Sequence, residues 1–289
     1  PAAQVSAQRI NEVLDKEIML HQGEKAEAKE RGTVEFQDVS FHYPSSGKDI
    51  LKHISFKAEK GQTIAFIGAT GSGKTTLVGL AARFYDATAG RVLVDGVDIK
   101  DYSFDALYDR IGYVTQKAVL FAGDIQENVL FGESLAPRTK ETVEQALRLS
   151  MAEEFVQKLE GGVKTPIAQG GSNVSGGQKQ RLSIARALAR KPEILIFDDS
   201  FSALDYKTDA ALRAGLSWEL QGTTCMIVAQ RIGTIRNADK IIVLENGEIA
   251  GMGTHEELLR ECSVYREIAE SQLSSEEIEQ QLAAGKGDK

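Results

Sequence analysis

Residues 68–75 read Gly68-Ala69-Thr70-Gly71-Ser72-Gly73-Lys74-Thr75, and this glycine-rich segment is the most specific structural signal in the chain. It matches G-x-x-x-x-G-K-[ST] in full, between the strand-like run 63–67 and the helix-like run 77–85, as the P-loop motif requires. Glycines permit backbone conformations that turn successive N–H groups inward, and the start of a helix adds its positive dipole end. The sequence therefore predicts a nucleoside triphosphate site in a strand–loop–helix unit.

The side chains of this loop have distinct expected roles. Lys74 places a point charge on the β- and γ-phosphates, and the Thr75 hydroxyl is positioned to bind Mg²⁺. The phosphate-binding candidates all lie in the loop or directly after it. They are Gly68, Thr70, Gly71, Ser72, Gly73, Lys74, Thr75 and Thr76.

A second element is expected to hold the metal ion, namely an apolar strand that ends in aspartate. Residues 194–197 (ILIF) are apolar, and Asp198 follows them, 123 positions after Thr75. Asp198 at the tip of the strand is expected to reach Mg²⁺ through water. Asp199 comes next, where a general base or a water-orienting carboxylate is expected. A solvated turn is the alternative interpretation of this aspartate pair.

A second glycine cluster, Ser175-Gly176-Gly177-Gln178, opens another predicted helix. The same dipole and N–H argument makes this helix start a second candidate anion site. An ordinary N-cap at Ser175 is the alternative, and it accounts for the serine but not for two glycines and the following glutamine. Two phosphate-binding helix starts imply either two ligands or a symmetric partner.

Composition and charge exclude several classes of protein. Of the 289 residues, 42% are apolar and 26% are charged, the proportions of a folded globular chain. The formal net charge of −8 argues against a nucleic-acid partner bound by bulk electrostatics. No window approaches the ~18–20 uninterrupted apolar residues that a membrane helix needs. The chain begins with Pro and has no signal peptide, so we expect a fragment of a longer protein.

The two cysteines, Cys225 and Cys262, lie 37 positions apart with no further cysteine or histidine at metal-ligand spacing. A disulfide framework is therefore not expected, and a reducing, cytosolic compartment fits better. We expect both thiols to be buried in apolar surroundings.

The order of strand-like and helix-like runs predicts an α/β fold with a parallel central sheet. Residues 117–187 interrupt the alternation and are predicted to form a mostly helical subdomain. The polar, helix-prone residues 1–30 precede the fold, and residues 272–289 are expected to be a solvated polar tail. The predicted strands are 33–43, 63–67, 91–94, 111–114, 194–197, 224–228 and 241–244, and the predicted helices are about 139–159, 177–190, 205–219 and 254–270.

These motifs, in this order, resemble the nucleotide-binding domain of an ATP-binding-cassette (ABC) transporter over residues 32–270. The VSGGQ of 174–178 is similar to that family's LSGGQ signature, and residues 202–205 (SALD) resemble its D-loop. Gln116 resembles the glutamine that contacts Mg²⁺ and the transmembrane domain. Tyr43 resembles the aromatic residue that stacks on adenine, with an aromatic side chain packed in the core as the alternative. The resemblance implies a P-loop NTPase (RecA-like) core, an antiparallel β subdomain and a helical ABC subdomain.

The N-terminal residues 6–17 (SAQRINEVLDKE) resemble the linker that follows an exporter's last membrane helix. The resemblance thus implies a linker over 1–30, a nucleotide-binding domain over 31–271 and a tail over 272–289. It also implies ATP and Mg²⁺ as cofactors, ATP hydrolysis coupled to export, and a place at the cytoplasmic face of the cell membrane. The implied partners are the transmembrane domain of the same transporter and a second ABC nucleotide-binding domain.

Two catalytic positions depart from the family pattern. The residue after the Mg²⁺ aspartate is usually Glu and is Asp199 here, one methylene or about 1 Å shorter, a displacement that can cost ~100-fold in rate. The histidine position of the family holds Gln230, which can donate a hydrogen bond but cannot titrate. With an intact signature, this pattern predicts one half of a heterodimeric exporter with a degenerate site of its own. A slow homodimeric exporter, a nucleotide-gated binding module without transport, an importer ATPase and a soluble ABC ATPase remain as alternatives.

Overall fold

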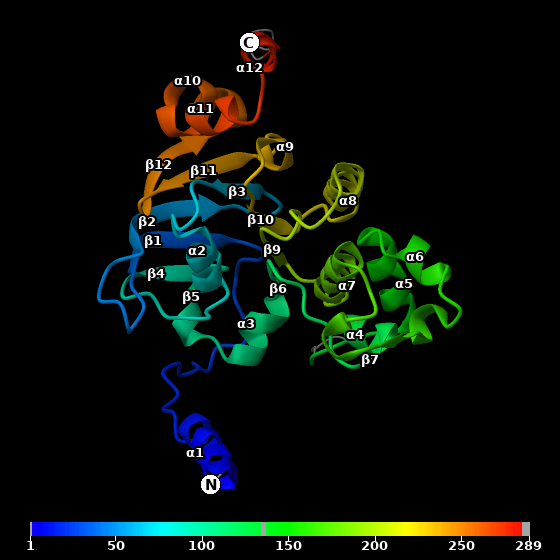
Figure 1. Cartoon of the computed structure of the whole chain (residues 1–289). Helices are drawn as coiled ribbons and strands as arrows, with labels where there is room; N and C mark the ends of the chain where they lie inside the picture. The colour runs from blue at the N-terminus through cyan, green and yellow to red at the C-terminus, as the bar shows by residue number, and fades with distance from the viewer. Residues whose placement is uncertain (1, 134–136, 285–289) are drawn as a thin grey trace.

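The computed structural model describes residues 2–133 and 137–284. In this part of the chain the central sheet has six strands in the order β12-β11-β3-β10-β9-β6 (Figure 1). Five strands run parallel, and β12 pairs antiparallel with β11. Their bounds are β3 Thr63–Ile67, β6 Ile111–Val114, β9 Ile194–Asp198, β10 Thr224–Val228, β11 Lys240–Glu245 and β12 Glu248–Gly253.

Two smaller sheets accompany the central one in the described residues. An antiparallel sheet has the order β2-β1-β4-β5, and β7 pairs with β8. This sheet confirms the predicted antiparallel β part of the fold. The bounds are β1 Val34–Phe41, β2 Leu51–Ala58, β4 Ala89–Val94, β5 Val97–Asp98, β7 Gly123–Asp124 and β8 Pro166–Ile167.

The helices fall into three groups in Figure 1. Those that accompany the sheets are α2 Lys74–Ala81, α3 Phe104–Arg110, α8 Tyr206–Glu219 and α9 Ile232–Ile235. Those gathered on one side of the sheets, with the short 3₁₀ turns Gly162–Lys164 and Gln169–Gly171, are α4 Ile125–Val129, α5 Lys140–Leu149, α6 Glu153–Gln157 and α7 Gly176–Leu188. Those toward the two chain ends are α1 Ala2–Leu14, α10 His255–Glu261, α11 Ser263–Glu270 and α12 Ser275–Ala284. The second group is the helical subdomain, and it confirms that part of the predicted fold class.

Buried apolar side chains form two clusters, one on each face of the central sheet. Leu195 and Phe197 of β9 enter the cluster that includes side chains of α5, α6 and α7. Ile194 and Ile196 enter the cluster that includes α2 and the antiparallel sheet. Because successive side chains of a strand point to opposite faces, a strand buried on both faces is a continuous apolar run. This burial explains the sequence ILIF at 194–197.

Two predicted helices are each divided in the structure. The predicted helix 139–159 stops at Leu149 and resumes at Glu153, because Met151 between them takes a left-handed conformation with φ 57°. The predicted helix 254–270 is interrupted at Cys262, where φ −113° and ψ 108° are extended. The strands β2 and β12 lie in stretches for which no strand was predicted.

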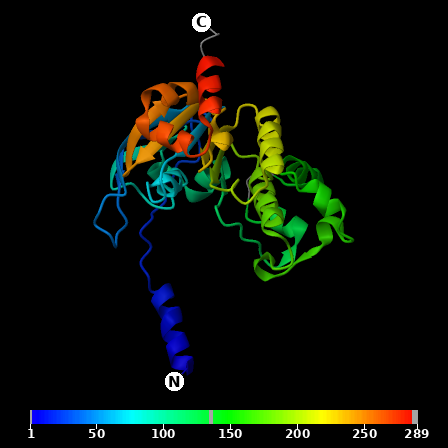
Figure 2. The same cartoon turned by 45° about the horizontal axis from the view of Figure 1, so that its top comes forward.

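The two chain ends differ in how they meet the folded body. Helix α1 projects away from it in both views (Figures 1 and 2), and residues 21–26 then run along the body, where Gly23 N donates to Tyr102 O at 2.8 Å. The predicted solvated tail is helical over α12, and His255 Nε2 lies 2.7 Å from Gln281 Oε1. The described residues contain no helix long and apolar enough to cross a membrane.

Candidate nucleotide-binding site

The backbone of the P-loop takes conformations that only glycine adopts freely. Gly68 and Gly73 have φ of 153° and 100°. A Cβ at Gly68 would lie 2.1 Å from Leu244 O, and one at Gly73 would lie 2.7 Å from a methyl carbon of Leu51. The loop between β3 and α2 is therefore packed too closely for any other residue at these two positions.

The Lys74 ammonium group lies inside the loop. Its Nζ donates to the carbonyl oxygens of Gly68 and Ala69, both at 2.8 Å, and to Ser72 Oγ at 3.3 Å. Burial lowers the pKa of Lys74, and the carboxylates of Asp199 and Asp198 oppose that shift. The ammonium group thus stands where phosphate oxygens could replace the loop carbonyls as its partners.

Asp198 lies at the carboxyl end of β9 beside the P-loop. Its Oδ1 accepts a hydrogen bond from Thr75 Oγ1 at 2.8 Å, and its Oδ2 accepts one from Tyr113 OH at 3.1 Å. The side chain is buried, and burial raises its pKa despite these two hydrogen bonds. The Tyr113 contact was not predicted, and no sequence motif marks it.

A single carboxylate oxygen of Asp199 accepts hydrogen bonds from the side-chain amides of both Gln116 and Gln230. Its Oδ2 accepts from Gln116 Nε2 at 3.0 Å and from Gln230 Nε2 at 2.7 Å. The residue has φ 46°, a left-handed conformation that aspartate tolerates better than most side chains, and it is buried. Burial also raises the pKa of this carboxyl group. Three residues that follow the carboxyl ends of β6, β9 and β10 thus converge at one edge of the sheet.

The oxygen donors around Asp198 fit Mg²⁺ when phosphate is also present. Carboxylate and hydroxyl oxygens are the ligands that this ion prefers, and it is usually bound by one or two carboxylates together with substrate phosphates. Thr75 and Asp198 supply such a pair. No group of three or more His, Cys, Asp or Glu side chains that could hold a metal alone occurs in residues 2–133 and 137–284. The donor set therefore suits an ion shared with a nucleotide.

Tyr43 lies next to the P-loop helix and also packs against the core. Its OH is 3.0 Å from Thr76 Oγ1, and its ring makes edge contacts with Phe41 and Tyr85 at centroid distances of 5.0 and 5.1 Å. The ring is half-buried. Position alone is therefore compatible with both interpretations of this residue, and the hydrogen bond to Thr76 was not predicted.

The second glycine cluster begins α7, on the helical subdomain rather than beside α2 (Figure 1). Ser175 Oγ accepts from Gln178 N at 3.2 Å, and Gln178 Oε1 accepts from Ser175 N at 2.9 Å. In this reciprocal capping box the side-chain amide oxygen of Gln178 is bonded to the backbone of the helix start. A Cβ at Gly176 would meet nothing within 4 Å, and one at Gly177 would meet only Ala203 O at 3.6 Å. The Gly176–Gly177 backbone is thus open to a ligand from outside.

Two polar side chains of α7, the buried Gln180 and the half-buried Arg186, make contacts that no sequence motif marks. Gln180 Nε2 donates to Thr115 O at 3.3 Å, directly before Gln116. Arg186 donates from Nε to Asn128 O at 2.8 Å and from Nη1 to Val119 O at 2.9 Å, and burial lowers its pKa to about 10. Gln180 stands four positions before the buried Ile184, so helical spacing was the signal that places it on the buried face.

A family model described as ABC transporter matches residues 51–202, which is more than half of the chain. The chain belongs to the ABC transporter family. This finding and the fold agree with the resemblance drawn from the motifs.

Individual relatives support the assignment. The chain is 44% identical over 279 residues to an uncharacterized ABC transporter ATP-binding protein of Mycobacterium tuberculosis, covering 95% of this chain and 48% of that protein. It is 43% identical over 270 residues to a Bacillus subtilis protein named "probable multidrug resistance ABC transporter ATP-binding/permease protein", covering 93% and 40%. A solved structure of a bacterial Atm1-family ABC exporter with ATP bound superposes with a TM-score of 0.84 at 32% identity, covering 93% and 47%. The chain thus spans half or less of the length of these relatives.

Proposed function

We propose that the chain is the ATP-binding and ATP-hydrolysing domain of an ABC exporter, and that its own site turns over slowly within a heterodimer. The observation that carries this proposal is the environment of Asp199. The carboxylate at the position of the general base is the shorter aspartate, and two amides hold it on one oxygen. The described residues bring no imidazole to that oxygen.

The residues of the P-loop edge support the binding of ATP with Mg²⁺. Lys74 and the loop N–H groups would bind the phosphates, and Thr75, Asp198 and Gln116 would hold the ion, while Tyr43 would stack on the base. Bound Mg²⁺ supplies neutralisation of charge on the phosphate oxygens. The contribution of the chain is to orient these groups and to exclude water from the buried carboxylates.

Slow hydrolysis follows from the chemistry of the two departures. Asp199 is shorter than glutamate, and a displacement of about 1 Å can cost ~100-fold in rate. Gln230 donates to Asp199 at 2.7 Å but has no titratable ring to share a proton. Both changes spare ATP binding, because neither side chain belongs to the phosphate loop.

The complete signature supports a role at a partner's site. The Ser175–Gly177 backbone opens outward from α7 and lies apart from the chain's own P-loop (Figure 1). Its donors therefore need a nucleotide held by a second ABC domain. An asymmetric pair gives both observations a function, since a slow site on this chain would be matched by a competent site on its partner.

An exposed aromatic pair supports docking against a transmembrane domain at the cytoplasmic face of the membrane. Phe121 and Phe131 stack at a centroid distance of 4.2 Å and are 43% and 49% exposed. The Arg186 guanidinium lies 5.4 Å from each ring centroid. Phe121 lies five positions after Gln116, whose side-chain amide donates to Asp199. A partner bound at this aromatic pair would therefore lie close in the chain to Gln116.

The test compares signature and carboxylate variants by steady-state ATPase of the full transporter. Gly177→Asp or Ser175→Ala should abolish most activity, because a donor aimed at developing charge contributes ~2.7–4 kcal/mol. Asp199→Asn should cost much less. Thr254→Ala is the matched control for Ser175→Ala, since Thr254 caps α10 with the same type of capping box. It should leave turnover unchanged.

A homodimer predicts the reverse comparison. Each site would then depend on Asp199 as well as on Ser175, so Asp199→Asn would lose as much activity as Gly177→Asp. That result would refute the heterodimer and support a slow homodimeric exporter. The buried, hydrogen-bonded Asp199 is the observation that keeps this second candidate, since such a carboxylate can still orient water.

A further inference from the structure

The short connection between β10 and α9 carries Gln230, whose side-chain amide donates to Asp199 Oδ2 at 2.7 Å. On the sheet side this connection is fixed, because Ala229 N donates to Phe66 O at 3.2 Å. Gln230 itself is exposed, so packing around it does not set the direction of its side chain. The contact with Asp199 therefore depends on what holds the main chain after Ala229.

Helix α9 begins directly after this connection and has no cap of its own. Its N-cap residue is Arg231, whose side chain makes no capping bond in the described part of the chain. A guanidinium group has no acceptor to offer. The first helical residue, Ile232, is fully buried, so its backbone N–H needs a partner. That partner has to come from a distant segment.

Gln272, in the connection between α11 and α12, supplies it. Gln272 Oε1 accepts from Ile232 N at 2.9 Å, and Gln272 Nε2 donates to Gln230 O at 2.8 Å. One side-chain amide thus bonds the main chain on both sides of Arg231, from 40 and 42 positions along the chain. Because its donor and its acceptor are both used, the orientation of the amide is fixed.

The backbone that carries Gln272 is anchored independently of its side chain. The backbone N–H groups of Gln272 and Leu273 both donate to Ala269 O, at 3.0 and 2.8 Å. Ala269 is fully buried in α11, and Leu273 packs against the core. The Gln272 side chain lies on the exposed surface, so it can be replaced without opening a cavity in that core.

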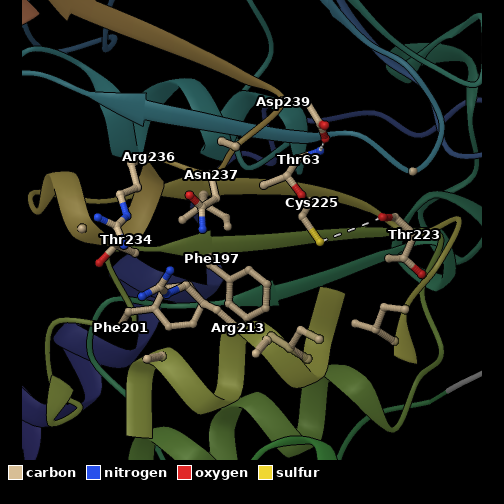
Figure 3. A pocket seen from close by; sticks show the side chains of 18 of the residues that line it. Thr63, Phe197, Phe201, Arg213, Thr223, Cys225, Thr234, Arg236, Asn237 and Asp239 are labelled. Atoms are coloured by element: carbon tan, nitrogen blue, oxygen red, sulfur yellow. Dashed lines mark hydrogen bonds between the residues drawn. The ribbon is translucent and has the colours of Figure 1, made fainter. Parts of the chain in front are cut away.

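The other end of α9 is held by a separate contact. Thr234 Oγ1 lies 3.4 Å from Asp209 Oδ2, and the same carboxylate accepts from Arg213 of α8. Figure 3 shows Thr234 and Arg213 at the same end of the space between α8 and the strands. Loss of the Gln272 amide would therefore release the start of α9 and the connection that carries Gln230, while the helix stays attached to α8.

We propose that Gln272 is a positioning residue for Gln230: it holds the main chain of residues 230–232 so that the Gln230 amide reaches Asp199. The catalytic consequence rests on the proposed function, because Asp199 affects hydrolysis only if this edge binds ATP. The positioning itself is a property of the folded chain. Gln272 is the first residue of the segment for which the sequence predicts a solvated tail, so this segment contributes to the site.

The first measurement is spectroscopic and needs no turnover. In ¹H–¹⁵N spectra of the 289-residue chain, the side-chain amide signal of Gln230 is assigned by its loss in Gln230→Ala. Gln272→Ala should shift this signal and make exchange of the Ile232 amide at least about tenfold faster, because that N–H loses its acceptor. Gln280→Ala is the matched control, since Gln280 is an exposed glutamine of α12. It should change neither signal.

A glutamate variant separates positioning from simple capping. Gln272→Glu keeps an acceptor for Ile232 N but loses the donor to Gln230 O. It should restore slow exchange at Ile232 and should not restore the Gln230 signal. If glutamate restores both, Gln272 only caps α9 and the proposal is overturned.

The second measurement is single-turnover ATP hydrolysis at this chain's own site, in the assembled dimer whose partner lacks its P-loop lysine. Gln272→Ala should lower the rate about threefold to tenfold, the effect of a hydrogen bond, and should leave ATP affinity unchanged. Gln230→Ala with Gln272→Ala should be no slower than Gln230→Ala alone, because a positioning residue has no effect once the residue that it positions is gone. Gln280→Ala should hydrolyse ATP at the wild-type rate.

The two measurements separate this proposal from the proposed function. If Gln230→Ala leaves hydrolysis unchanged, the catalytic part of the proposed function fails, and the spectra still decide the positioning. The positioning role is overturned if the Gln230 signal in Gln272→Ala is that of the wild type. It is also overturned if the rate losses of Gln230→Ala and Gln272→Ala add.

Discussion

Replacing Asp199 by glutamate together with Gln230 by histidine should raise ATP hydrolysis at this chain's own site. The wild-type carboxylate is one methylene shorter than that of glutamate, and two amide donors bond to it, at 3.0 Å from Gln116 and 2.7 Å from Gln230. Glutamate adds one C–C bond of about 1.5 Å, or about 1 Å of net reach. Histidine at position 230 supplies a ring that can share a proton.

The expected gain is set by that reach. A displacement of about 1 Å accounts for up to ~100-fold in rate, which corresponds to about 2.7 kcal/mol of activation free energy. The change also has a folding cost. Position 199 has φ 46°, and a left-handed conformation costs a side chain such as glutamate roughly 1–2 kcal/mol. The double variant should therefore hydrolyse ATP faster and unfold more easily than the wild-type protein.

The assay is single-turnover ATP hydrolysis in the assembled dimer, with the partner's own P-loop lysine replaced so that only this site contributes. Asp199→Gln with Gln230→His is the matched control, because it has the length of glutamate without the carboxylate. It should remain as slow as the wild type. If the double variant with glutamate binds ATP normally and hydrolyses it no faster than this control, the short carboxylate at position 199 is not the cause of slow hydrolysis.

Three further predictions concern single side chains. Tyr43→Ala should weaken ATP binding by roughly 1–3 kcal/mol, the range for base–aromatic stacking. Tyr43→Phe should weaken it less, because this change removes only the hydrogen bond to Thr76. Calorimetry measures both affinities, and wild-type affinity in Tyr43→Ala would assign the ring to the core. Asp199→Asn should raise the free energy of unfolding at pH 7, because burial raises the pKa of the Asp199 carboxyl group. The stabilising contribution of Asp199 is therefore present below its unfolded pKa and is lost as the pH rises through its folded pKa. Urea unfolding should show that this gain shrinks as the pH falls toward about 4, and a gain independent of pH would contradict the assignment. Arg186→Met should lower the free energy of unfolding by about 1.5–3 kcal/mol, because it removes the charge-assisted hydrogen bonds from the guanidinium to Asn128 O and Asn128 Oδ1. Thermal unfolding measures this loss, and a loss as small as that of an exposed substitution would show that the guanidinium does not hold the segment.

Local patterns determined the elements that surround the nucleotide site. The P-loop is predictable because its glycines, lysine and threonine serve one backbone conformation within eight residues, and the structure has the expected strand, loop and helix there. The central strands are predictable because burial on both faces requires continuous apolar runs. The cap at Ser175 is equally local, since both of its hydrogen bonds are made with Gln178, three positions later.

Predictions failed where a local pattern was interrupted by a single residue or by distant packing. Met151 and Cys262 look like ordinary members of helical runs, yet each breaks a predicted helix. The segment 272–289 is expected to be a solvated polar tail, and α12 within it is largely exposed, although Gln281 Oε1 lies 2.7 Å from Nε2 of the buried His255. The two helix breaks are not visible in the periodicity, because Met151 and Cys262 change the backbone conformation and not the spacing of apolar residues.

The motifs of the sequence identify the candidate site residues one by one, but the three-dimensional fold brings the distant ones into contact. Gln116, Asp199 and Gln230 are separated by 83 and 31 positions, and they meet on one oxygen atom because β6, β9 and β10 are neighbours in the sheet. Strand order and register arise from the packing of the whole sheet, so contacts across it cannot be deduced from the spacing of residues along the chain.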